Sequence, residues 1–437
     1  MTISFQYKII TVCLFCSLIL HNMQAQYLTV QQAVAITVEN NFGILLKQNE
    51  IKKLSVNNTA GAAGMLPNLS AGATKTYNVN NTELDFFSGD VRKENGAKSN
   101  STVADATIRW TVFDGLGMFA AKDYLNQLEK AGKADLTAKI EQTIVDVIDK
   151  HTEIVLLKKY IATLEENLKL SNARKNIADK KKQIGTGSAL SANQSMVDLI
   201  NDSTTLITQQ INYEKAKVDL NQLMALPPDS PVLVDTAITL IKNFAYDTLL
   251  QAAQNQNSIL QVARYNKMAT ADYLRMQQAL RLPSINLFGG LAFSQSQAEI
   301  GVLERSQNMV VNYGASISIP LFDGGSINRQ VATSKIDALN AAINVKDKLL
   351  DLETQFNQAV TEHKGLLVIL QLSQQNVSIA KSNANIALEQ YRNGATTDID
   401  FRATQQIAIV AENDLLTAMY KLKVVESKLL QLSGNLY

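Results

Sequence analysis

The sequence contains one short junction twice, at a fixed distance. Phe-Asp-Gly occurs at residues 113–115 and again at residues 322–324, which is 209 residues later. A glycine turn at Gly185 and Gly394 keeps the same spacing, and so does the pair Leu223 and Leu432. Because one offset holds over such a long stretch, we interpret the chain as an internal tandem repeat. Whatever structure the first half adopts, the second half is expected to adopt as well.

Each junction separates a strand pattern from a long helix pattern. Residues 106–112 and 313–319 alternate apolar with polar side chains, which is typical of a strand. Roughly 70 residues without proline follow each junction, rich in the helix formers Ala, Leu, Lys, Glu and Gln. Apolar residues recur there every seven positions: Ile140, Val147, Ile154, Ile161 and Leu168, then Leu349, Phe356, His363, Leu370 and Val377, with His363 the exception. This spacing predicts helices packed as coiled coils, on the order of 100 Å long.

The repeat divides the chain into four segments. Residues 1–25 combine Lys8, an apolar run and a small residue at Ala25, and are expected to be a secretory signal peptide. Residues 26–226 form the first structural repeat, residues 227–245 an equatorial linker between the repeats, and residues 246–437 the second. Each repeat is expected to contain a medium helix, a strand, a polar loop, a strand, a very long helix, a tight turn and a returning helix.

Composition and motifs argue against several classes of function. The 41 Lys and Arg nearly balance the 40 Asp and Glu, so no nucleic-acid partner is indicated. Both cysteines, Cys13 and Cys16, lie in the signal segment, which leaves the mature chain without a thiol, a disulfide or a Cys-based metal site. We find no phosphate loop, nucleophile elbow or paired catalytic carboxylates. No enzymatic activity, no cofactor and no metal site are therefore expected.

The predicted strands have one apolar and one polar face. They begin at Leu66, Ser101, Leu282 and Asn312, and polar loops are expected at residues 80–100 and 295–310. This alternation fits the strands of a membrane barrel, and equally a half-buried sheet in a soluble α+β protein. No segment after the signal has the roughly 18 apolar residues of a spanning helix. Four strands cannot close a barrel around a pore, so a barrel would require several protomers.

Several motifs together resemble the TolC-like outer-membrane efflux protein family. They are "PLFDGG" at residues 320–325, "LP" before two strands, and "YRNGATTDIDFRATQ" at residues 391–405, within the twofold repeat. The resemblance extends from about Tyr27 to the C-terminus. It implies an α+β membrane protein of Gram-negative bacteria. Three protomers, a homotrimer, would contribute four strands each to a 12-stranded β-barrel that continues into a long α-helical coiled-coil periplasmic tunnel.

The resemblance also implies a function. The protein would be the exit duct of a tripartite efflux or secretion system, passively conducting substrates through the outer membrane. Its partners would be a periplasmic adaptor (membrane fusion) protein, an inner-membrane pump of the RND or ABC type, and outer-membrane lipid. Two alternatives stay open at this point: a dedicated type I protein or peptide secretion duct, and a nonconducting periplasmic coiled-coil stalk.

The family pattern assigns residues to the periplasmic end of the duct. The adaptor would dock on the helical hairpin tips, at Ile184, Gly185, Thr186, Asn393, Gly394 and Ala395. The family's inner carboxylate ring matches Asp400, and its second ring falls on Ala403. Its tyrosine matches Tyr391, whereas its latch arginine and carboxylate are replaced by Thr396 and Ser191. Asp398 would either supply a second ring or cap the returning helix. Arg392 and Arg402 are nearby cations that could pair with either acid.

The repeated junctions are expected to be structural. They consist of Phe113, Asp114 and Gly115 in the first half and Phe322, Asp323 and Gly324 in the second. At each, Phe would pack at the junction, Asp would cap the long helix, and Gly would allow the change of direction.

Overall fold

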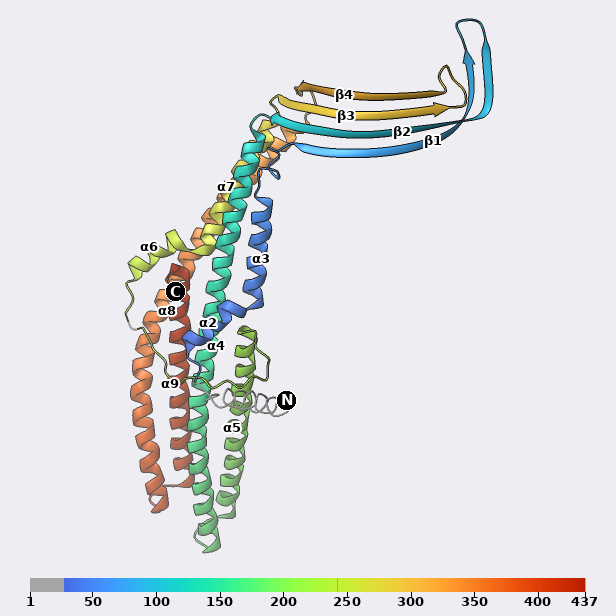
Figure 1. Cartoon of the computed structure of the whole chain (residues 1–437). Helices are drawn as coiled ribbons and strands as arrows, with labels where there is room; N and C mark the ends of the chain where they lie inside the picture. The colour runs from blue at the N-terminus through green and yellow to red at the C-terminus, as the bar shows by residue number, and fades with distance from the viewer. Residues whose placement is uncertain (1–26, 242, 437) are drawn as a thin grey trace, which may run out of the picture. The chain divides into compact units, whose positions relative to one another are not determined.

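The computed structural model describes residues 27–241 and 243–436 (Figure 1). The signal peptide assigned to residues 1–25 lies outside them. The chain forms two compact units. One contains the described residues of Met1–Lys47, Leu136–Ser258 and Leu349–Tyr437, and the other contains Gln48–Asp135 and Ile259–Lys348. Each unit therefore draws on both halves of the sequence.

The long helices and the returning helices of the two halves have matching lengths. The helices are α2 (Val30–Asn40), α3 (Phe42–Asn57), α4 (Gly117–Gln183), α5 (Ala189–Leu223), α6 (Tyr246–Gln256), α7 (Ser258–Ala279), α8 (Ser326–Arg392) and α9 (Asp398–Ser433). Both α4 and α8 have 67 residues, and the returning helices α5 and α9 have 35 and 36. Among the residues that the structure describes, no helix has the length and hydropathy needed to cross a membrane.

The medium helix expected in each half is in fact two helices. The break falls at Asn41 between α2 and α3, and at Asn257 between α6 and α7. Each asparagine donates its side-chain amide to a carbonyl near the end of a returning helix, Asn41 to Leu223 (2.9 Å) and Asn257 to Leu432 (3.2 Å). An asparagine that bonds to backbone competes with helix continuation, which explains the two breaks.

The heptad positions form the buried faces of the long helices. Val147, Ile154, Phe356 and Leu370 are all buried, as the seven-residue repeat predicts. The polar exception, His363, is fully buried because both ring nitrogens have partners. Its Nε2 lies 3.2 Å from the Ile241 carbonyl oxygen, and its Nδ1 lies 2.9 Å from the Tyr246 hydroxyl. The histidine thus fixes the segment that joins the two halves.

The four strands form one antiparallel sheet in chain order. They are β1 (Asn68–Asp85), β2 (Val91–Phe113), β3 (Ser284–Ala298) and β4 (Arg305–Ser318). The polar loops expected at residues 80–100 and 295–310 are mostly strand, and only residues 86–90 and 299–304 remain as turns. The prediction was wrong because cross-strand pairs such as Glu83 with Lys93 support polar strands that have no apolar face. Figure 1 shows this β1–β2 hairpin running beyond β3 and β4 and bending.

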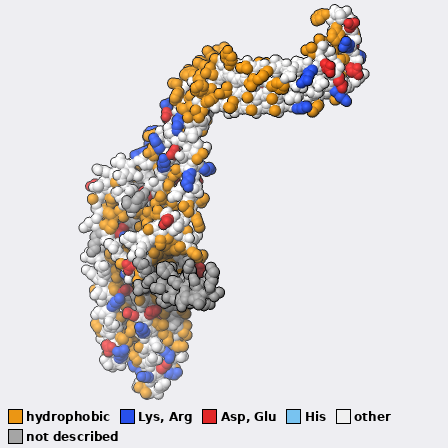
Figure 2. All heavy atoms as spheres, viewed as in Figure 1, with side chains coloured by type: hydrophobic (Ala, Val, Ile, Leu, Met, Phe, Trp, Pro, Cys, Tyr) orange, Lys and Arg blue, Asp and Glu red, His pale blue; other side chains and the backbone are white. Residues whose placement is uncertain are grey.

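The pairing register gathers apolar side chains on one face of the sheet. Successive rows across the strands read Leu69–Ile108–Gly289–Tyr313, then Ala71–Ala106–Leu291–Val311, then Ala73–Ala104–Phe293–Met309. The next row, Lys75–Thr102–Gln295–Gln307, is entirely polar. On β3 the apolar band extends from Ile285 to Phe293, about 26 Å along the strand. In Figure 2 hydrophobic side chains gather on the sheet near its helical end, and charged ones gather at the far hairpin.

The first strand-to-helix junction needs glycine because neighbouring chain lies very close. Gly115 has a φ of 72°, and a Cβ at this position would lie 2.6 Å from the Ala279 carbonyl oxygen and 2.6 Å from Leu282 Cβ. Any side chain would collide with this segment in addition to straining the backbone. Gly324, at the second junction, has a similar φ of 66° but open space around it.

The capping predicted for both junction aspartates holds for Asp323 alone. Its carboxylate accepts from the N–H groups of Gly325 (2.9 Å) and Ile327 (2.6 Å) at the start of α8. In the described part of the chain, Asp114 Oδ1 is buried without a hydrogen-bond partner, because the segment that covers Gly115 encloses it. The predicted packing of Phe322 is also not made within one chain: its side chain is 91% exposed at the open β4 side of the sheet, whereas Phe113 is half-buried.

Candidate functional site

The candidate site lies at the ends of two helical hairpins, α4–α5 and α8–α9. Each hairpin turns through a glycine in the left-handed region, Gly185 with a φ of 75° and Gly394 with a φ of 74°. The turn residues named above as docking positions, Ile184, Gly185, Thr186, Asn393, Gly394 and Ala395, are all exposed. Both tips are therefore accessible in a single chain.

The two returning helices begin with equivalent caps. Ser188 caps α5 and accepts from the Ser191 N–H, and Thr397 caps α9 and accepts from the Asp400 N–H. The suggestion that Asp398 caps α9 is thus wrong, since the threonine before it already satisfies the free N–H group. Asp400 is exposed, and its carboxylate accepts from the Thr397 hydroxyl at 2.6 Å. It therefore belongs to the capped first turn, with its outer edge open to solvent.

Asp398 instead belongs to a buried ion network centred on Arg174 of α4. The Arg174 side chain is 1% exposed. Its Nε and Nη2 donate to the two carboxylate oxygens of Asp398, at 2.7 Å each, and its Nη1 donates to Asp198 of α5 at 2.7 Å. A fork-shaped guanidinium suits this bidentate geometry. Arg174 thereby joins the first hairpin to the start of α9.

A second arginine extends the network along α9. Arg402 donates to both oxygens of Asp202 on α5, at 2.8 Å each, and lies 3.7 Å from Asp198. Gln405 and Ser171 continue the chain of hydrogen bonds into the helix core. The expectation that Arg392 or Arg402 pairs with Asp398 or Asp400 is wrong, because Arg402 faces α5 and Arg392 bonds Glu389 within its own helix. The network thus holds two arginines and three carboxylates.

The surroundings stabilise the ionised form of Asp398. Burial raises the pKa of this carboxyl, but the Arg174 hydrogen bonds and charge, with hydrogen bonds from Tyr391 and Ser191, lower it more, so that the net pKa is below its ordinary value. Burial, with the negative charge of Asp398, raises the pKa of Tyr391 to about 12. The tyrosine ring stacks on Phe401 at 5.7 Å and lies 4.4 Å from the Lys181 ammonium.

The structure brings together Tyr391, Ser191 and Asp398 of the predicted gate residues, whereas Asp400 and Thr396 lie outside the ion network. A cleft of about 640 Å³ opens beside it, lined in part by Leu190 and Ile399. Sequence reasoning missed Arg174, Asp198 and Asp202. Asp198 and Asp202 are four residues apart and therefore share one helix face. That spacing was a usable signal for the acids, but nothing pointed to Arg174, which lies 224 residues from Asp398.

Comparisons with known proteins point to one family. A sequence model described as outer membrane efflux protein matches residues 249–435. The outer membrane protein TolC of Salmonella enteritidis is 21% identical over 364 residues, which cover 82% of this chain and 72% of that protein. Nodulation protein T of Rhizobium leguminosarum bv. viciae is 21% identical over 413 residues, which cover 90% and 79%.

Solved structures share the fold over nearly the whole chain. The outer membrane protein VceC of Vibrio cholerae superposes with a TM-score of 0.77 at 17% identity, covering 93% of this chain and 96% of that one. The CmeC outer membrane channel of Campylobacter jejuni gives a TM-score of 0.78 at 16% identity, covering 93% and 86%. The relatives are channels and efflux proteins rather than enzymes, which supports a role in transport. Together with the repeated junctions and hairpins, these findings make the chain similar to the TolC-like outer-membrane efflux proteins in sequence and in fold.

Proposed function

We propose that three copies of this chain form the outer-membrane exit duct of a tripartite efflux system in a Gram-negative bacterium. The observation that carries the proposal is a four-stranded sheet with an apolar band on one face and an unpaired strand at each edge. An edge strand presents unpaired N–H and C=O groups, which a bilayer does not tolerate. Three sheets joined edge to edge into twelve strands would leave no such edge.

The dimensions of the band support a lipid-facing surface. Outer-membrane barrels carry an apolar band about 25 Å tall with a polar interior. The band here follows about 26 Å of strand, and its side chains remain exposed in the single chain, such as Leu69 (75%), Val311 (70%) and Ile317 (68%). The opposite face carries polar rows, for example Ser70–Thr107–Gly290–Asn312. A wet lumen would suit these residues.

Exposed apolar stripes on the helices support assembly with further copies. On α5, Val197, Ile211 and Val218 follow in one seven-residue register and Ile200 and Ile207 in another, and each is between 44% and 56% exposed. On α8, Leu372, Ile379 and Ile386 follow every seven residues and are between 53% and 62% exposed. A heptad stripe left in solvent indicates a coiled-coil partner. We assign that partner to the neighbouring protomer.

The hairpin tips would form the periplasmic gate and the adaptor-docking surface. The Arg174 network fixes the start of α9 against the first hairpin, and Asp400 lies exposed on the first turn of α9. Three copies of Asp400 around a threefold axis would attract cations and repel anions. The six exposed tip residues would contact a periplasmic adaptor, and an RND or ABC pump would act through it. The proposal includes passive conduction through a long periplasmic portion.

Single-channel conductance of the purified protein in a planar bilayer tests the proposal. We expect a small cation-selective conductance whose selectivity weakens in Asp400→Asn. The matched control is Glu389→Gln, which removes an exposed acid in the last turn of α8 and should leave selectivity unchanged. A pore that D400N does not alter would refute the gate assignment and retain the duct. Failure to insert would favour the nonconducting stalk.

A further inference from the structure

A pocket lies just past the apolar band, where the sheet meets the β1–β2 hairpin. Its volume is about 690 Å³, and its lining includes Tyr77, Val79, Lys98, Asn100 and Gln297. These five residues have the same strand parity as the band, since Tyr77 pairs with Asn100, Asn100 with Gln297, and Val79 with Lys98. Side chains of one parity point to one face of a sheet. Asn78, Ser99 and Ala298, which have the opposite parity, line the pocket as well, so these five residues form its band-side wall, beyond the last apolar row.

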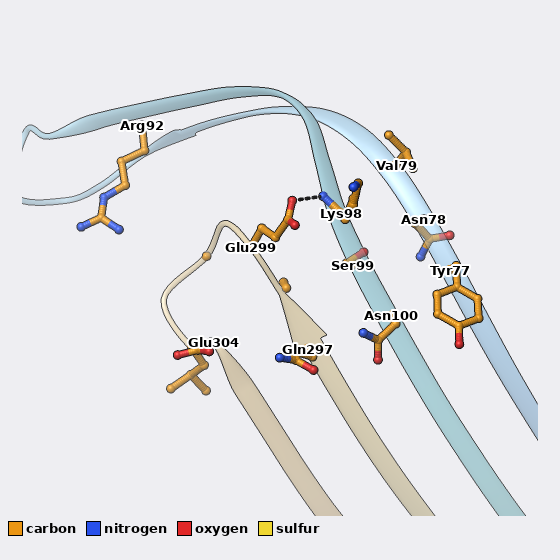
Figure 3. Close-up of a pocket in the computed structure, with 13 residues that line it drawn as sticks. Tyr77, Asn78, Val79, Arg92, Lys98, Ser99, Asn100, Gln297, Glu299 and Glu304 are labelled. Carbon is orange, nitrogen blue, oxygen red and sulfur yellow. Dashed lines mark hydrogen bonds between the residues drawn. The ribbon is translucent and has the colours of Figure 1, made fainter.

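The projecting β1–β2 hairpin contributes another wall of this pocket. Arg92 of the hairpin lines it, and Figure 3 shows Arg92 on the hairpin at some distance from Lys98, with Glu299 in between. The register shifts between Asn80 and Thr82, where the strand pair is irregular. Such an irregularity bends a strand pair locally, and it lies between the band and the hairpin end.

Among the residues that the structure describes, four cations on or beside the pocket make no ion pair with a carboxylate. Lys75 lies over the Tyr77 ring at 5.2 Å, Arg92 lies over the Phe86 ring at 5.5 Å, and Arg305 donates to the neutral Gln295 at 3.2 Å. The structure gives the Lys98 ammonium no ion pair within residues 27–241 and 243–436. By contrast Lys93, the neighbour of Arg92 on the opposite face of the hairpin, pairs with Glu83 at 2.6 Å.

Two carboxylates also line the pocket. The Glu299 side chain accepts from the Lys98 backbone N–H at 2.8 Å, so it extends the pairing of β2 with β3, as the dashed line in Figure 3 shows. Glu304 is exposed beyond it. Arg92 and Lys98 match these two carboxylates within the lining, and Lys75 and Arg305 beside the pocket add the positive excess. That excess lies in the rows directly past the band, where polar and aromatic side chains replace apolar ones.

We propose that this pocket binds the phosphate-bearing headgroup of an outer-leaflet lipid. The inference rests on the proposed function, because the band defines where the lipid chains end. A lipid whose chains cover the band would place its headgroup level with Lys75, Arg305 and Lys98, which lie within about 13 Å of strand. Basic residues at this depth attract anionic headgroups. The acyl chains of such a lipid would lie along the apolar rows, whereas a free anion would not contact them.

Titration of the detergent-solubilised protein with labelled lipid A tests this proposal. The compounds are lipid A with its two phosphates, the same lipid dephosphorylated, and inorganic phosphate. The variants Arg92→Gln and Lys98→Gln each remove one pocket cation, and the control Lys93→Gln removes one cation outside it. We expect each pocket variant to lose about fivefold in affinity for the phosphorylated lipid, the control to match the wild type, and the dephosphorylated lipid to bind at least several-fold more weakly.

Three outcomes overturn the proposal. If the two lipids bind equally, the phosphate does not contribute to binding. If inorganic phosphate binds tightly, the pocket is an anion site that does not require a lipid. Equal losses in all three variants show a general charge effect. Planar-bilayer recordings on the same samples separate this inference from the proposed function. If the protein conducts but does not prefer the phosphorylated lipid, only the headgroup-binding proposal is contradicted. If the protein does not insert into the bilayer, the proposed duct is contradicted.

Discussion

Arg174 illustrates how one buried side chain can control the hairpin tips. It pairs with two carboxylates that are themselves only 13% and 12% exposed, so its removal leaves Asp398 without a cation and Asp198 with Arg402 alone, at 3.7 Å. Breaking a buried pair costs about 3–5 kcal/mol. We expect Arg174→Met to lower the stability of the folded protein by about that amount, and to increase single-channel conductance because α9 is released from α4. Thermal unfolding in detergent and bilayer recordings measure the two effects.

The matched control for this prediction is Arg392→Met. Arg392 is 49% exposed and bonds Glu389 within the same helix at 2.8 Å. Such a pair contributes about 0.5 kcal/mol or less. Equal effects of the two substitutions would show that the network does not fix the tip.

Asp149 of α4 provides a prediction about pH. Burial, with the nearby charge of Asp146, raises the pKa of this carboxyl to about 6, and its Oδ1 has no hydrogen-bond partner in the described chain. A folded pKa above the ordinary value of 3.8 means that the folded state binds the proton more tightly. The contribution of this carboxyl group to the stability of the folded state is therefore largest below pH 3.8, and it is lost as the pH rises to about 6.

Substitution by asparagine should remove that loss. We expect Asp149→Asn to unfold at a higher temperature than the wild type at pH 7.5. Its free energy of unfolding should be higher by about 1–2 kcal/mol, a value reduced to allow for the partial exposure of the group. At pH 4.5 the difference should be smaller. Asp229→Asn, an exposed carboxylate in the linker, should match wild type at both values. A decrease in stability at pH 7.5 would instead indicate that a partner binds Asp149.

At the residue scale, sequence reasoning succeeded where the pattern was local. Gly185 and Gly394 turn the hairpins as the repeat predicts. It failed where burial depends on distant segments: nothing near Asp114 distinguishes it from Asp323, yet the segment carrying Ala279 and Leu282 covers only the first junction. Arg174 was missed for the same reason, because its two partners come from other helices.

Strands test the lipid-facing assignment most directly, because adjacent residues point to opposite faces. Val311 lies in the apolar band and Asn312 on the polar face. A lysine on the lipid face near the bilayer centre costs about 2–4 kcal/mol, whereas one in a lumen is solvated. We expect Val311→Lys to reduce the folded protein recovered from outer membranes severalfold and Asn312→Lys to have little effect. Equal recovery of both would argue against lipid on this face.

The bounds of the long helices could be predicted from the sequence, whereas those of the β1–β2 hairpin could not, for a physical reason. The long helices have uninterrupted helix-forming sequence, and their ends follow the glycine turns. The β1–β2 hairpin consists mostly of polar residues whose pairing is satisfied between strands, so neither hydrophobic alternation nor propensity identified it. Asn41 and Asn257 likewise look unremarkable in a helical sequence, and their breaks depend on carbonyls of distant helices.

Assembly of several copies is the property of the whole molecule on which the proposed function depends. Ile207 is 56% exposed in the heptad stripe of α5, and Leu206 beside it is buried within the chain. A charge in the stripe would be buried between protomers without disturbing the fold of one protomer. We expect Ile207→Asp to be monomeric after extraction in detergent, under conditions in which the wild type forms the proposed trimer. Asn212→Asp, an exposed position beside the stripe, should leave the mass unchanged.

Light scattering coupled to size-exclusion chromatography measures this mass, and circular dichroism checks that the helices persist. Helical monomers in the Ile207→Asp variant, with loss of conductance, would link assembly to the duct. An unchanged trimer would place the α5 stripe away from the protomer contacts, leaving the α8 stripe and the open strands β1 and β4 to hold the copies together. Loss of helical signal would attribute the effect to folding, and the exposed Ile200→Asp variant would then repeat the test one heptad away.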